Sequence, residues 1–315
     1  MWKSRINTKQ NLLSQPVFHW LRCFLLLTIL TGLLIGLGGC KEAAEYEYET
    51  TTFFLPNDRG TWTYGEAVMP VMDEPCPLVF LAHGFKGTRN SGGAKELSQR
   101  LAANGIGAVR IDFNPYLAEN LDGGQLDQYT LKTMEADALM AMEYCMNHFS
   151  VDGDRLGVYG RSMGGRVAMI LGNESSGGYD FKAMTLIAPA GNESAMVYYM
   201  GGLERWEDMK DIALKDGFCE KQGLNLTYDW FTSFEAYNPA KTGHKFGDKP
   251  VLVFYNTLDT VVLPETSLEC ASGYENVTVV EVTTEDGHGY EMGWKESSLK
   301  EEIMDQITKF FIENL

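Results

Sequence analysis

The chain has 315 residues, of which 44% are hydrophobic and 12% aromatic, and this composition excludes a disordered or fibrous protein. Its formal net charge is −17, and four of the 26 Lys and Arg residues precede residue 40, in a stretch without a single acidic residue. The remainder is therefore strongly acidic, which argues against nucleic acid as a partner because phosphate binding needs a basic surface.

The N-terminal segment is typical of a targeting sequence. Basic residues precede an apolar run over 24–37, which ends at Gly38-Gly39-Cys40. This ending resembles the lipobox of bacterial lipoproteins, which implies a signal peptide over 1–39, a lipid on Cys40 and attachment to a bacterial membrane. The alternative is an uncleaved anchor, because the apolar run is nearly long enough to span a bilayer. On both interpretations the rest of the chain lies outside the cytoplasm.

After Cys40 the sequence is first polar, and it then alternates between short apolar runs and amphipathic segments. Residues 40–52 are polar and acidic, which favours a tether, and 53–55 with 61–71 predict an antiparallel strand pair around a turn. From Pro77 short apolar runs alternate with amphipathic segments, the pattern of βαβ units. The expected strands are 78–82, 108–111, 156–159, 183–187, 251–255 and 277–282. The expected helices are 94–103, 131–149, 163–171 and 299–312. We therefore expect an α/β domain over 53–315 with a doubly wound, mostly parallel sheet.

The stretch from about 191 to 249 breaks this alternation. It is too long for a structureless loop in a compact domain, so we expect an inserted cap subdomain. Its aromatic residues either form the core of the cap or line a substrate cleft, and the sequence leaves both open. They are Tyr198, Tyr199, Trp206, Phe218, Tyr228, Trp230, Phe231, Phe234 and Tyr237.

Four cysteines follow Cys40, namely Cys76, Cys145, Cys219 and Cys270. An even number outside the cytoplasm permits disulfides, and three pairings are possible. Cys145 lies among apolar residues of an expected helix, so a buried free thiol is an equal alternative there.

The strongest motif is Gly160-Arg161-Ser162-Met163-Gly164, placed between an expected strand and an expected helix. A serine in such a G-x-S-x-G turn occupies a strained elbow and exposes its hydroxyl at the end of the sheet. Ser162 is therefore the candidate nucleophile.

A serine hydroxyl needs a base to accept its proton. Among the five histidines, His19 lies in the signal segment, His148 at a helix end and His244 in the cap. His83 follows the first parallel strand and is expected to support its loop by hydrogen bonds. His288, in a glycine-flanked loop between the last strand and the last helix, remains as the candidate base.

The base needs a carboxylate to orient it. Asp259 follows the strand at 251–255, at the sheet edge where parallel strands present catalytic groups. Asp286 is nearer to His288 in sequence, but two residues apart on one loop they would align poorly. In folds that carry a G-x-S-x-G elbow between a strand and a helix, the serine comes first, the acid second and the histidine last, and Ser162, Asp259 and His288 follow this order. The developing oxyanion needs fixed donors, and the backbone N–H groups of Phe85 and Met163 are the candidates.

Five motifs together resemble the α/β-hydrolase superfamily. They are HGF at 83–85, RIDF at 110–113, GRSMGG at 160–165, LDTVV at 258–262 and GHGY at 287–290. They are most similar to bacterial cinnamoyl/feruloyl esterases and to serine aminopeptidase-like and monoacylglycerol-lipase-like hydrolases, over about 77–315 without the cap. The resemblance implies the same nucleophile, acid, base and oxyanion donors. It breaks at Asn114-Pro115-Tyr116-Leu117, where relatives carry a Gly-His-Gly loop, so we expect a different acyl-pocket wall.

The sequence therefore predicts a serine hydrolase that acts through an acyl-enzyme on short-chain or aryl esters, with hydroxycinnamate esters as a fitting substrate. A serine peptidase and a monoacylglycerol lipase are alternatives within the same fold. A non-catalytic surface binding lipoprotein is the alternative from another class. No metal or cofactor is implied.

Overall fold

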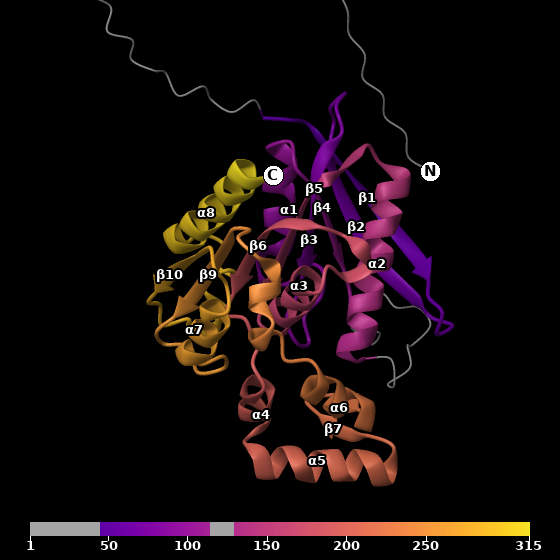
Figure 1. The fold of residues 1–315 in the computed structure, drawn as a ribbon, viewed down its shortest axis with the longest axis vertical. Helices are drawn as coiled ribbons and strands as arrows, with labels where there is room; N and C mark the ends of the chain where they lie inside the picture. The colour runs from indigo at the N-terminus through magenta and orange to yellow at the C-terminus, as the bar shows by residue number, and fades with distance from the viewer. Residues whose placement is uncertain (1–44, 114–128) are drawn as a thin grey trace, which may run out of the picture. The chain divides into compact units, whose positions relative to one another are not determined.

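The fold is built on an eight-stranded sheet in the order β1-β2-β4-β3-β5-β6-β9-β10, seen in a computed structural model that describes residues 45–113 and 129–315 (Figure 1). The strands β3 to β6, β9 and β10 run parallel, while β1 and β2 form an antiparallel pair at one edge. The strands are β1 (Tyr48–Pro56), β2 (Trp62–Pro70), β3 (Cys76–Ala82), β4 (Gly107–Ile111), β5 (Val151–Arg161), β6 (Phe181–Ile187), β9 (Val251–Asn256) and β10 (Val277–Val282). The expected signal segment 1–39, Cys40 and the loop at 114–117 lie outside the described residues.

Helices cover both faces of the sheet. One buried cluster joins the sheet to α1 (Ala94–Ala103) and α8 (Ser298–Asn314). The other joins it to α2 (Leu131–His148), α3 (Met163–Asn173) and α7 (Pro264–Ser272). The central strands are buried along their length, which is why they read as continuous apolar runs. The expected doubly wound α/β architecture is thus confirmed.

Strand β1 and helix α7 differ from the sequence prediction, and β5 begins at Val151, five residues before the expected start at 156. Strand β1 begins at Tyr48, so the last residues of the expected tether 40–52 pair with β2. Phe53 is the one buried residue of this edge strand, so the strand lacks the apolar alternation that would have revealed it. Helix α7 was not expected, because Thr266 and Ser267 belong to its buried face and weaken the apolar pattern.

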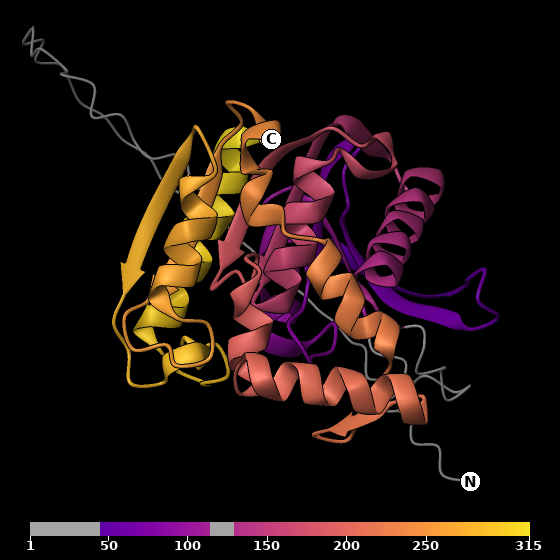
Figure 2. The ribbon, with the colours of Figure 1, turned by 60° about the horizontal axis from the view of Figure 1, so that its bottom comes forward.

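The segment expected as a cap contains α4 (Ser194–Met200), α5 (Leu203–Asp216), the hairpin β7 (Cys219–Lys221) and β8 (Leu224–Leu226), and α6 (Tyr228–Ala236). Figures 1 and 2 show the three helices grouped together at one end of the sheet. The short helices η4 (Pro239–Lys241) and η5 (Gly243–Phe246) that follow pack against α3 instead. The chain therefore returns to the body of the domain before β9 begins.

Four of the nine cap aromatics are buried in the interior. Trp206, Trp230, Phe231 and Phe234 are each at most 2% exposed. The ring of Phe231 meets those of Trp206 and Trp230 edge-on, with centroids 4.9 and 5.0 Å apart. These contacts form an aromatic cluster in the cap, which is continuous with the buried core on one face of the sheet.

All four described cysteines are buried free thiols, so none of the three possible disulfide pairings is present among them. Burial raises the pKa of the Cys270 thiol to about 12 and that of Cys145 further still. These thiols are therefore protonated and serve as apolar packing groups.

No helix among residues 45–113 and 129–315 is long and apolar enough to cross a membrane.

The aromatic cluster of the cap generates a stability prediction. Phe231→Ala should lower the free energy of unfolding by about 3–5 kcal/mol, because it removes a fully buried ring and leaves a cavity. Tyr228→Ala, an exposed position in the same helix, should change it by less than about 0.5 kcal/mol. Urea unfolding of the two variants checks this, and equal effects would contradict the aromatic cluster described above.

Candidate active site

The turn between β5 and α3 holds Ser162 in a strained conformation. Its backbone has φ 56° and ψ −123°, outside the regions that side chains prefer. Two hydrogen bonds hold it there: the Ser162 N–H donates to Ile187 O at 2.9 Å, and the Ala190 N–H donates to Ser162 O at 3.0 Å. The end of β6 and the loop behind it therefore fix the elbow.

The glycines of the motif are explained by close approach at this elbow. A Cβ atom on Gly160 would overlap the carbonyl oxygen of Gly164, and one on Gly164 would overlap that of Ala82. Gly84 lies against Ser162 itself, where a Cβ would be 3.1 Å from the serine Cβ. Strand β3, strand β5 and helix α3 thus meet around the serine at distances that only glycine allows.

Asp259 and His288 are hydrogen-bonded to each other. His288 Nδ1 lies 2.7 Å from Asp259 Oδ2, and the Asp259 side chain is only 1% exposed. The other oxygen, Oδ1, accepts the N–H groups of Val261 at 2.8 Å and Val262 at 3.0 Å. Both oxygens of the carboxylate therefore accept hydrogen bonds. Because Asp259 Oδ2 can only accept, we place the proton of neutral His288 on Nδ1, and Nε2 is then free to accept a proton.

The alternative acid, Asp286, does not pair with His288. Its Oδ2 accepts the Glu291 N–H at 2.7 Å, within its own loop. Asn256 was missed by the sequence analysis and ties the two loops together. Its fully buried amide donates to Thr284 O and Gly287 O, and its Oδ1 accepts the N–H groups of Leu258 and Thr284.

Two cavities meet at these residues. One of about 150 Å³ runs along the loop after β3, and one of about 190 Å³ runs toward α4. Ser162, His288 and Phe85 border both of them. The structure therefore brings together the residues that the sequence analysis named from three distant segments.

The cap contributes little aromatic surface to these cavities. Of the nine aromatics named above, Tyr199 is the one that borders the cavity toward α4, beside Met196 and Val261. Its ring contacts that of Phe85 edge-on, with centroids 5.8 Å apart. Tyr198, Phe218 and Tyr228 are exposed instead. The cleft wall of the described residues is thus mainly aliphatic on this side.

His83 supports the loop after β3, as expected. Its Nδ1 donates to Gly84 O at 2.8 Å, and its Nε2 accepts the Phe113 N–H at 3.0 Å. Burial lowers the pKa of His83 to about 4, so the ring is neutral at pH 7 and can accept that hydrogen bond. The loop carrying Gly84 and Phe85 is therefore tied to the end of β4.

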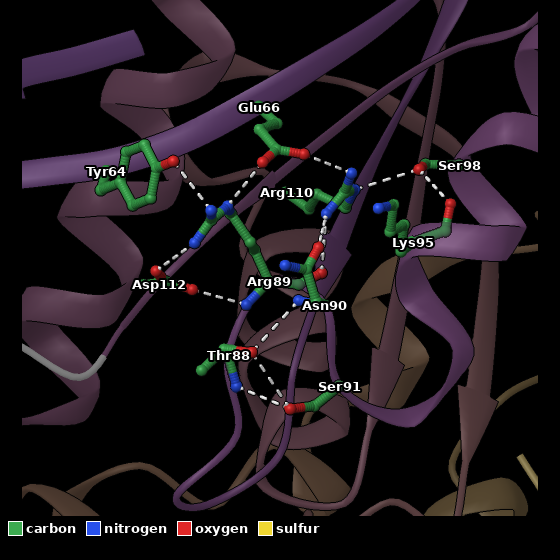
Figure 3. A network of polar contacts seen from close by, with 10 residues as sticks. All are labelled: Tyr64, Glu66, Thr88, Arg89, Asn90, Ser91, Lys95, Ser98, Arg110 and Asp112. Carbon is green, nitrogen blue, oxygen red and sulfur yellow. Dashed lines mark hydrogen bonds and ion pairs between the residues drawn. The ribbon is translucent and has the colours of Figure 1, made fainter. Parts of the chain in front are cut away.

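A buried ionic network holds the other end of this loop (Figure 3). Arg89 donates to Glu66 at 2.9 Å and to Asp112 at 2.8 Å, and its own N–H donates to Asp112. Arg110 is 1% exposed and donates to Glu66, to the Arg89 carbonyl and to Ser98. The RIDF motif thus supplies Arg110 and Asp112, which position the loop. This role could not be predicted from the sequence, because Glu66 joins the network only through the pairing of β2 with β4.

No three His, Cys, Asp or Glu side chains in the described parts of the chain are grouped as metal ligands.

The architecture and the comparisons indicate the same fold. The mostly parallel sheet, the serine elbow after β5 and the loops after β9 and β10 make up the α/β-hydrolase fold. Residues 75–189 match the family model of an alpha/beta hydrolase domain, a region that contains Ser162 and ends before Asp259 and His288. No curated protein matches the chain in sequence.

Solved structures share the fold at low sequence identity. Est1E from Butyrivibrio proteoclasticus is 20% identical, with a TM-score of 0.62 over 83% of this chain and 98% of that one. The same protein with ferulic acid bound gives a TM-score of 0.63 over the same shares. The esterase domain of a Rhodothermus marinus protein is 16% identical, with a TM-score of 0.60 over 84% of this chain and 99% of that one.

The buried neutral His83 generates a prediction about acid stability. Because its folded pKa of about 4 lies below the unfolded value of 6.5, the unfolded chain binds the proton first as the pH falls. The stability contribution is complete above pH 6.5 and decreases toward pH 4. Between pH 7.5 and pH 5 this one group should lower the free energy of unfolding by about 2 kcal/mol.

Comparing urea unfolding at pH 7.5 and pH 5 for the protein and for His83→Gln checks this prediction. The variant should lose about 2 kcal/mol less on acidification, whatever its stability at pH 7.5. An identical pH dependence in both proteins would mean that His83 does not stay neutral in the fold.

Proposed function

We propose that the protein is a serine carboxylic-ester hydrolase that acts through an acyl-enzyme, with Ser162 as nucleophile, His288 as base and Asp259 as the acid that orients it. The observation that carries the proposal is the 2.7 Å bond between His288 and Asp259 at the cavities that Ser162 borders. A histidine held by a buried carboxylate beside an elbow serine is the arrangement that activates a hydroxyl.

In the first half-reaction, Ser162 Oγ forms a bond to the ester carbonyl carbon while its proton passes to His288 Nε2. Asp259, retained as a carboxylate, stabilises the imidazolium that results. The tetrahedral intermediate then breaks its bond to the alcohol oxygen, which leaves with the proton from His288. In the second half-reaction, water adds to the acyl carbon, gives its proton to His288 and releases the acid, and Ser162 recovers its proton.

The oxyanion donors in this proposal are the N–H groups of Phe85 and Met163. Met163 is the first residue of α3, so its N–H is one of those that a helix leaves without an intrahelical acceptor. Phe85 follows Gly84 in the loop that His83 and the ionic network hold in place. Fixed donors cost no reorganisation when charge develops, which is why the loop needs this support.

Short-chain or aryl esters are the substrates we propose. The two cavities at Ser162, of about 150 and 190 Å³, offer space for short groups beside the nucleophile. Est1E, solved with ferulic acid bound, motivates the hydroxycinnamate ester as an aryl candidate. Because four of the cap aromatics form the aromatic cluster, stacking by the cap rests on Tyr199 alone among the described residues.

A serine peptidase or a monoacylglycerol lipase would use the same residues. Turnover of methyl ferulate, a short p-nitrophenyl ester, a long-chain monoacylglycerol and a peptide distinguishes these activities. A non-catalytic binding lipoprotein would lack an activated serine and would not react with a fluorophosphonate probe.

The proposed roles generate a mutational prediction. Ser162→Ala should abolish fluorophosphonate labelling and lower kcat on a short p-nitrophenyl ester by about 10⁶-fold, and Asp259→Asn should lower it by about 10⁴-fold. Ser272→Ala, an exposed serine on α7, is the matched control and should retain full labelling and turnover. Labelling that persists in Ser162→Ala, or Asp259→Asn turnover within threefold of the unmodified protein, would overturn these assignments.

We also propose that a lipid on Cys40 attaches the protein to the outer side of a bacterial membrane. The support is the Gly38-Gly39-Cys40 ending of the apolar run.

Cys40→Ser should therefore move the protein from the membrane fraction to the soluble fraction, with unchanged activity on soluble esters, because residue 40 precedes the first strand. Fractionation followed by an ester assay of both fractions checks this. Retention of the variant in the membrane would favour the uncleaved anchor instead.

A further inference from the structure

Arg161 has no role in the mechanism above, yet it borders the same cavity as Ser162. It is the last residue of β5, directly before the elbow, and its partly buried side chain lies beside the cavity of about 150 Å³. Ser91 and Tyr159 border this cavity as well. A cation and two hydroxyl-bearing side chains are thus placed next to the reacting serine.

Among residues 45–113 and 129–315, the guanidinium of Arg161 has no acidic partner. Its Nη2 donates to the carbonyl oxygens of His288 and Gly289, which are neutral acceptors. Its Nε is buried without a hydrogen-bond partner. No carboxylate of the described residues lies within 4.0 Å of it, in a protein whose net charge is −17. A partly buried cation without a counter-ion is costly, and an anionic ligand would offset that cost.

The loop after β3 leaves room for this guanidinium. Gly92 has a φ of 61°, and a Cβ atom there would overlap Arg161 Nη1. Gly92 also borders the cavity, so Nη1 lies against bare backbone at the cavity wall. No described residue accepts a hydrogen bond from Nη1.

We propose that Arg161 binds an anionic group, a carboxylate, of the substrate, so that the preferred esters carry a carboxylate a few bonds from the scissile carbonyl. This inference rests on the proposed esterase function and narrows its substrate class. The cavity volume equals that of roughly five water molecules in the liquid, which accommodates a short carboxylate-bearing arm. Charge-assisted hydrogen bonds from a guanidinium to a carboxylate are stronger than hydrogen bonds between neutral groups.

The test compares esters that differ only in a carboxylate and its neutral amide. Monoethyl succinate and ethyl succinamate place the group on the acyl side, and O-butyryl glycolate and O-butyryl glycolamide place it on the alcohol side. We expect kcat/KM to favour the carboxylate about 10- to 100-fold within at least one pair, as expected for a hydrogen-bonded charge pair. The side on which the preference occurs identifies the part of the substrate that Arg161 binds.

Variants of Arg161 separate binding from support of the His288 loop. Arg161→Gln removes the charge and should bring the carboxylate-to-amide ratio close to 1, while Arg161→Lys should retain part of it. Arg155→Gln is the matched control, because Arg155 lies on the same strand, outside the cavity, and pairs with Asp152. It should leave the ratio unchanged.

The outcomes are distinguishable. If Arg161 only supports the loop, Arg161→Gln will slow both members of a pair equally, and the unchanged ratio would overturn the inference while the esterase function stands. Hydrolysis of both amide esters without any preference for the carboxylates would do the same. Failure of the unmodified protein to hydrolyse any of the four esters or to react with a fluorophosphonate probe would overturn the esterase function and this inference together.

Discussion

The close approach of β3, β5 and α3 around Ser162 is the constraint on which the rest of the site depends. Gly160 and Gly164 permit contacts that any Cβ would block, and the positive φ of Ser162 is compensated by hydrogen bonds to the end of β6. Such strain persists only where the surroundings over-determine it. Here the surroundings are the buried central strands of the sheet, which hold the candidate nucleophile in place.

The supporting residues are polar and buried, and they act on loops rather than on the chemistry. His83 holds the loop after β3 at one end, and Glu66, Arg89 and Arg110 hold it at the other. Buried polar groups of this kind are favourable only when each finds its partner, so the network specifies one loop conformation. The oxyanion donor that we propose in this loop, the backbone N–H of Phe85, would require such a fixed conformation.

Local pattern was sufficient to locate the six parallel strands, although it missed the first five residues of β5, and to name the candidate site residues. Strand β10 was expected over the residues it occupies, because its flanking segments and β-branched composition mark it. Ser162, Asp259 and His288 each follow a strand of the parallel sheet, so their convergence could be inferred from topology. Their catalytic roles remain predictions.

Other features depend on contacts between distant segments and were not accessible in this way. Strand β1 has one buried residue, and its pairing with β2 decides where it begins. The aromatics of the cap are alike in sequence, but burial sends Trp230 inward and leaves Tyr228 exposed. Arg161 occupies a variable position of the G-x-S-x-G motif, so its contacts with the backbone carbonyls of His288 and Gly289 could not be predicted from the motif.

Asn256 also limits how this protein can change over evolution. One amide side chain bonds the loop after β9 and the loop after β10, so neither loop can gain or lose a residue without disturbing the other. The cap is attached differently, as one insertion between β6 and β9, and η4 and η5 return the chain to the body of the domain. Insertions and deletions should therefore accumulate in the cap, while the two short loops keep a constant length across related sequences.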